Sequence, residues 1–208
     1  MLTLHVEGAE FTVRDERAGE PVLLVAGSGA PDRVWDVHQV PALLSAGFRV
    51  VTFDRTAART LGRPEDPRRV AAELAVAMER LELAPCRVVG ASFGAEVVQE
   101  LLLTWPDLVS RAVLMAARGR SDLFAGEMAD AERELEASGV RLPPRYAAWL
   151  RAVLNLSPAT WRREEEVLDW LDLFEAVERT GAAGTPTPSG EEPDDRLPAL
   201  GRVTVPVL

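Results

Sequence analysis

A serine between two glycines lies in the middle of the chain, in the pattern Gly90-Ala91-Ser92-Phe93-Gly94. A run typical of a buried strand precedes it, and an apolar run with helical spacing follows. A serine on such a tight strand-to-helix turn has a strained backbone, and small residues two positions before and after it keep the strand and the helix from colliding. The free N–H groups of the helix N-terminus favour developing negative charge. We therefore predict that Ser92 is a catalytic nucleophile, with Gly90 and Gly94 as the glycines of its turn.

A second glycine pair, Gly27-Ser28-Gly29, follows an earlier apolar run. A loop at this place can direct a backbone N–H toward the same point above the sheet. We predict that the N–H groups of Ser28 and Phe93 form a two-donor oxyanion hole, with Gly27 as a loop glycine. An ordinary strand-to-helix turn is the alternative. A dinucleotide-binding G-x-G-x-x-G pattern fails, because Asp32 stands where the third glycine is needed.

A serine nucleophile needs a base within hydrogen-bond reach, and the chain has only two histidines, His5 and His38. His5 lies on the opening hairpin, far from the predicted turn. His38 follows Trp35 on the first predicted helix, where a half-exposed polar role is simplest and substrate contact or a substitute base is the alternative. We take His38, Trp35 and Trp149 as candidate substrate contacts. No carboxylate can be assigned as a triad acid, and two histidines and one cysteine form no metal-ligand spacing, so neither metal nor cofactor is expected.

Strand and helix patterns alternate through the first 118 residues. The apolar runs predict strands at 3–7, 10–14, 21–26, 48–54, 86–90 and 111–116, and the helical spacings predict helices at 32–46, 67–83 and 93–105. This alternation indicates βαβ units. The fold class is therefore predicted to be α/β, with a mostly parallel, doubly wound sheet.

From about residue 121 only helical patterns follow, at 121–138, 144–154 and 159–180. We predict an α/β core at 1–118, a helical cap at 119–180, a flexible linker of Gly, Pro, Ser, Thr and acidic residues at 181–196, and the start of a terminal core strand at 197–208. The aromatic and leucine residues of the helical block fit an ordinary core-facing stripe. Their alternative role is the roof of an apolar pocket.

On these residues the chain resembles the α/β-hydrolase superfamily, specifically serine hydrolases with a helical cap. The resemblance rests on the opening hairpin, loop 26–29, residues 47–54, the nucleophile elbow at Ser92 and residues 106–114. It implies an esterase-like enzyme that acts on an ester or related acyl bond. Ala26 stands where the family often has histidine, and residues 55–60 replace a glycine-containing run. The family's triad acid and histidine come late, after strands that are absent here, so the chain is expected to be C-terminally short with an incomplete catalytic triad.

Three interpretations therefore stay open. The chain is a serine ester or acyl hydrolase that is weakly active or inactive as given, a non-catalytic small-molecule-binding or accessory protein of hydrolase descent, or a fragment of a longer hydrolase. The first predicts slow turnover that depends on Ser92, and the second predicts ligand binding that does not.

The composition limits the partners. Acidic residues outnumber arginines by 33 to 23, which gives a net charge of −10, so nucleic acid and anionic membranes are not expected as partners. A single cysteine and the lack of a secretory signal favour a cytoplasmic location. The expected partner is a hydrophobic small-molecule substrate or ligand. Strand 111–116 would lie at an apolar sheet edge, which predicts self-association.

Overall fold

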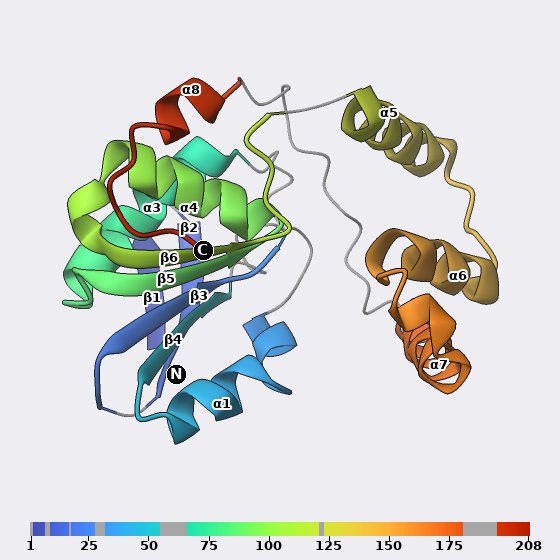
Figure 1. Cartoon of the computed structure of the whole chain (residues 1–208), viewed down its shortest axis with the longest axis horizontal. Coiled ribbons are helices and arrows are strands. Elements are labelled where there is room, and N and C mark those ends of the chain that lie inside the picture. The colour runs from blue at the N-terminus through green and yellow to red at the C-terminus, as the bar shows by residue number, and fades with distance from the viewer. Residues whose placement is uncertain are drawn as a thin grey trace. The chain divides into compact units, whose positions relative to one another are not determined.

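The computed structural model describes residues 2–6, 9–16, 18–27, 32–54, 66–120, 123–180 and 195–208. The first part of the chain forms a six-stranded sheet, in which the strands lie in the order β1-β2-β4-β3-β5-β6 (Figure 1). β1 and β2 form an antiparallel hairpin and β2 is antiparallel to β4, whereas β4, β3, β5 and β6 are parallel. The predicted α/β fold with a mostly parallel sheet is confirmed. The strands are β1 (Leu2–Val6), β2 (Ala9–Glu16), β3 (Pro21–Val25), β4 (Arg49–Asp54), β5 (Cys86–Ala91) and β6 (Val109–Met115).

Helices pack on both faces of this sheet. On one face, α3 (Pro67–Arg80) and α4 (Phe93–Thr104) bury their apolar sides against β5 and its neighbours. On the other face, α1 (Gln39–Ser45) contributes Val40 to a smaller cluster with Trp35 and residues of β3 and β4. The start of α3 is well defined, because the Asp66 carboxylate accepts a hydrogen bond from the Arg68 N–H at 3.0 Å and Pro67 occupies the first turn.

The predicted helix at 32–46 is wrong in its first half. The structure has a 3₁₀ turn, η1 (Asp32–Trp35), and a separate helix that begins only at Gln39. Pro41 explains the break. Proline has no N–H to donate and its ring collides with the carbonyl four residues earlier, so it fits only in the first turn of a helix.

The end of the chain pairs with β6 through a short contact. A turn of helix, α8 (Leu197–Leu200), leads to residues 203–208, and Val207 forms a parallel bridge with Ala112. The Ala112 N–H donates to the Pro206 carbonyl at 2.9 Å, and the Leu208 N–H donates to the Ala112 carbonyl at 3.0 Å. The predicted terminal strand is thus reduced to an isolated bridge, and Pro206 is tolerated because only its carbonyl is used. Self-association through this edge stays a prediction.

The chain divides into two compact units, Met1–Ala129 with Pro186–Leu208, and Asp130–Thr185. The predicted cap began earlier, at residue 119, and most of the predicted linker lies outside the described residues. The remaining elements are α5 (Leu123–Ser138), α6 (Pro144–Asn155), η2 (Pro106–Leu108), η3 (Thr160–Arg162) and α7 (Glu164–Thr180). Within the described residues, no helix has the length and apolar character needed to cross a membrane.

The second unit is built on the α6–α7 helix hairpin. Ala148 and Ala152 of α6 are fully buried, and Ala152 packs in a small cluster with Val167 and Leu171 of α7. Ion pairs join the two helices at their surface. Arg145 Nη1 lies 3.0 Å from Asp172 Oδ1, and Arg151 Nη2 lies 2.6 Å from Glu178 Oε1. Small residues at the contact and paired charges beside it hold this hairpin together.

Candidate active site

Ser92 occupies the turn between β5 and α4. Its backbone has φ 53° and ψ −122°, a conformation that costs energy in any residue with a Cβ atom. It is the N-cap of α4, it is exposed, and its side chain forms no capping hydrogen bond with the helix. This is the geometry expected of a nucleophile elbow.

The two glycines of the turn are required by close packing between strand and helix. A methyl group at Gly90 would collide with the Gly94 carbonyl and lie 2.8 Å from the Ala95 Cα. A methyl group at Gly94 would collide with the Val25 carbonyl and lie 2.7 Å from the Ala26 carbonyl oxygen. Backbone atoms cannot move aside as a flexible side chain does, so both positions need glycine.

The loop after β3 begins directly beside Ser92. A methyl group at Gly27 would lie 3.2 Å from the Ser92 Cβ and 3.8 Å from its Oγ. Ser28, the predicted partner in the oxyanion hole, lies outside the described residues. Phe93 is the first residue of α4, and its N–H donates to no backbone acceptor among the described residues. The structure therefore brings Gly27, Ser92 and Phe93 together.

The end of β6 forms another border of this site. The Ser92 N–H donates to the Met115 carbonyl at 2.9 Å, and Met115 pairs with Ala91 in the parallel ladder. The next residue, Ala116, has φ 50°, which is unusual for a residue other than glycine. A strained residue thus follows β6 next to the strained serine.

The two histidines differ in their relation to this site. His5 is on β1, and three strands separate β1 from β5 in the sheet. His38 directly precedes α1, is exposed, and does not cap the helix with its side chain. A helix that joins two parallel strands starts near their carboxyl ends, which is the edge where Ser92 lies. His38 is therefore at the same edge of the sheet as Ser92, whereas His5 is remote from it.

The two predicted tryptophan contacts have different environments. Trp35 is 2% exposed and packs in the cluster of α1, β3 and β4, as a core residue does. Its Nε1 has no hydrogen-bond partner among the described residues. Trp149 is half exposed on α6, with its ring centroid 5.8 Å from that of Tyr146. Trp149 belongs to the second unit, and its role as a substrate contact stays a prediction.

One acidic side chain lies in the first turn of α4, soon after the elbow. Glu96 is in the first turn of α4, and burial raises the pKa of its carboxyl, although the nearby Arg196 and Arg118 oppose the shift. Among the described residues, no group of three or more His, Cys, Asp or Glu side chains is arranged to hold a metal ion.

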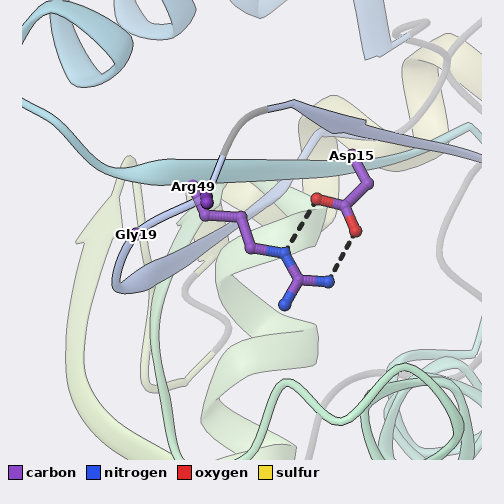
Figure 2. A pocket seen from close by; sticks show the side chains of 4 residues that line it. Asp15, Gly19 and Arg49 are labelled. Carbon is purple, nitrogen blue, oxygen red and sulfur yellow. Dashed lines mark hydrogen bonds and ion pairs between the residues drawn. The ribbon is translucent and has the colours of Figure 1, made fainter.

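A separate hollow lies at the opposite, amino end of the parallel strands. It has a volume of about 580 Å³ and is lined by Asp15, Ala18, Gly19 and Arg49 (Figure 2). The Arg49 Nε and Nη2 donate to the two Asp15 carboxylate oxygens at 2.9 and 2.6 Å. This pairing holds the pKa of Asp15 below its usual range. Because both charges are already satisfied and Ser92 is at the other end of β5, this hollow is not part of the Ser92 site.

Three buried polar residues on or against α4 were missed by sequence reasoning. Gln99 and Glu100 are buried on α4, and Arg196 is 7% exposed although it was assigned to a flexible linker. One signal was present, because Gln99 and Glu100 interrupt an otherwise apolar helical stretch. Arg196 gave no local signal, since its partners lie almost a hundred residues earlier in the chain.

Comparison with known protein families identifies the family of this chain. The model of the alpha/beta hydrolase family matches residues 22–208. The chain is an α/β-hydrolase. This α/β-hydrolase is 41% identical over 200 residues to the "Putative non-heme bromoperoxidase BpoC" of Mycobacterium tuberculosis, a match that covers 93% of this chain and 75% of that protein. The crystal structure of that protein superimposes with a TM-score of 0.82 at 39% identity, over 95% of this chain and 75% of that one.

Two further relatives are more distant. The α/β-hydrolase is 34% identical to the 2-hydroxy-6-oxo-2,4-heptadienoate hydrolase of Pseudomonas putida over 119 residues, which is 55% of this chain and 43% of that protein. A thermophilic esterase from Thermogutta terrifontis superimposes with a TM-score of 0.63 at 20% identity, over 99% of this chain and 74% of that one. This last likeness shows the fold alone.

Proposed function

We propose that the chain is a serine hydrolase of carboxylic esters or related acyl compounds, with Ser92 as its nucleophile. The observation that carries this proposal is the Ser92 backbone, held at φ 53° at the N-terminus of α4 with an exposed side chain. In such a reaction the Ser92 oxygen attacks the acyl carbonyl carbon, and its proton passes to a base. Negative charge develops on the carbonyl oxygen. The Phe93 N–H, with that of Ser28, is the proposed donor to this oxyanion.

The base that would activate Ser92 has the least support among the proposed catalytic groups, so we propose slow turnover. His38 is the one histidine at the same edge of the sheet as Ser92, and its side chain does not cap α1. Serine enzymes that lose a triad member keep a rate roughly 10³ to 10⁴ times that of the uncatalysed reaction, from binding and the oxyanion hole. We propose turnover of that order for these 208 residues.

The test is hydrolysis of p-nitrophenyl acetate together with labelling by a fluorophosphonate probe. We expect slow hydrolysis and slow labelling by the wild type, and loss of the labelling in Ser92→Ala. Ser45→Ala is the matched control, since Ser45 is an exposed serine at the end of α1. Labelling that is unchanged in Ser92→Ala would show that Ser92 is not the nucleophile. Hydrolysis as fast as that of an intact triad would contradict the proposed weakness of the base.

A non-catalytic, ligand-binding function is the second candidate. One observation favours it: of the chain's two histidines, only His38 is at the same edge of the sheet as Ser92. Under this alternative a small apolar acid such as octanoate binds equally well to the wild type and to Ser92→Ala, as measured by calorimetry, and the fluorophosphonate probe labels neither protein.

A further inference from the structure

A buried amide links the elbow helix to the loop that follows β6. Gln99 lies in the middle of α4 and is 2% exposed. Its Nε2 donates to the Arg118 carbonyl at 3.0 Å, and its Oε1 accepts from the Arg196 Nη1 at 3.1 Å. Both ends of the amide are thus used, one on the loop and one on a residue close to the C-terminal helix turn.

Arg196 also connects α4 to the loop that follows β6. Its Nε lies 2.9 Å from Glu100 Oε1, and its backbone N–H donates to the Gly119 carbonyl at 2.8 Å. Gly119 lies against the end of the Leu197 side chain, which is flexible enough to move aside. Burying an ion pair adds little net stability compared with an apolar replacement. Such a network is therefore better explained by the geometry that it fixes.

That geometry is the position of the loop relative to Ser92. Three of its carbonyls accept hydrogen bonds: Met115 from the Ser92 N–H, Arg118 from Gln99, and Gly119 from the Arg196 N–H. Between them lies Ala116 with its positive φ, which persists only when the surrounding structure holds it. The Gln99 side chain bonds this loop directly, whereas Arg196 bonds the loop through its backbone N–H and α4 through its side chain.

We propose that Gln99 and Arg196 are positioning residues, which hold the loop at 115–119 beside Ser92 and so fix the space next to its hydroxyl in which the acyl group of a substrate lies. With the loop held, this space has a defined size and favours short acyl groups over long ones. The preference for short acyl groups rests on the proposed function. The positioning of the loop by Gln99 and Arg196 is independent of that function.

The test compares Gln99→Leu and Arg196→Met with the wild type by hydrogen exchange and by ester selectivity. We expect peptides covering 112–120 and 195–204 to exchange about tenfold faster, since each variant removes buried hydrogen bonds. Peptides of α3 should stay unchanged. Two kcat/KM values should also be compared, one for p-nitrophenyl acetate and one for p-nitrophenyl octanoate. Their ratio, acetate over octanoate, should fall about threefold or more as the space loosens.

Arg202→Met is the matched control, because Arg202 is exposed and lies in the same terminal segment. It should change neither exchange nor selectivity. Arg196→Lys keeps the charge but has one nitrogen in place of three, and it should give an intermediate effect in a protein that still folds. Exchange at 112–120 equal to wild type in Gln99→Leu and Arg196→Lys would overturn the positioning role. If the wild type hydrolyses neither ester, the proposed function fails, and the exchange data alone decide the positioning.

Discussion

The strained backbone of Ser92 predicts that glycine at this position stabilises the protein while it abolishes any Ser92 chemistry. At φ 53° and ψ −122° a Cβ atom meets steric resistance, which costs about 1 to 3 kcal/mol for a residue in a sparsely populated backbone region. Glycine escapes this resistance but loses more backbone entropy on folding, about 0.5 to 1 kcal/mol. Ser92→Gly should therefore have a free energy of unfolding about 0.5 to 2 kcal/mol higher than that of Ser92→Ala.

The comparison with Ser92→Ala is the useful one, because both variants lack the hydroxyl and differ only at the Cβ atom. Urea unfolding followed by circular dichroism measures the difference, provided that the two denaturant slopes agree. Glu82, with φ 52° just after α3, supplies a reference outside the site, through Glu82→Gly and Glu82→Ala. If glycine stabilises at position 82 but Ser92→Ala is as stable as Ser92→Gly, the elbow is unstrained and the central structural argument for Ser92 is refuted.

Two further predictions concern the residues around the elbow. Gly94→Ala should lower the free energy of unfolding by about 3 kcal/mol, because its methyl group meets the Val25 and Ala26 carbonyls, whereas Gly201→Ala, with nothing closer than 3.5 Å, should cost little in the same urea assay. Burial raises the pKa of Glu96 above 4.5, so its stabilising contribution is complete below the unfolded pKa and is lost as the pH rises through the folded pKa. The free energy of unfolding of Glu96→Gln should thus rise relative to that of the wild type between pH 4.5 and pH 7. A difference between the two proteins that does not vary with pH would contradict this.

Much of the fold was predictable because its signals are local. Parallel strands buried on both faces appear as continuous apolar runs, as at Val22 to Val25, and these runs gave the order of strands and helices. The elbow was predictable for the same reason, since five consecutive residues contain the serine and both glycines that its turn requires. The structure confirms the α/β-hydrolase fold on which that interpretation depends.

The remaining features depend on contacts between residues distant in sequence. Arg196 stands in a polar, proline-containing stretch that locally looks like a linker, and only the fold brings it to Gln99 and Glu100. The break before α1 was missed because apolar spacing continues across Pro41, and the spacing does not register a missing N–H group. Whether a base reaches Ser92 also depends on contacts between residues that are distant in sequence. The positions of two histidines in the sequence could not answer it.

The α6–α7 hairpin has a consequence for how this protein can evolve. Its buried alanines and its interhelical ion pairs are satisfied within the hairpin, so its integrity depends on few positions. Exposed positions such as Trp149, Val153 and Leu173 are outside that set. Substitutions there can accumulate without loss of either compact unit, because surface changes away from cores and networks cost little stability. The hairpin is therefore a region where the sequence can change at its surface while the hairpin itself stays folded.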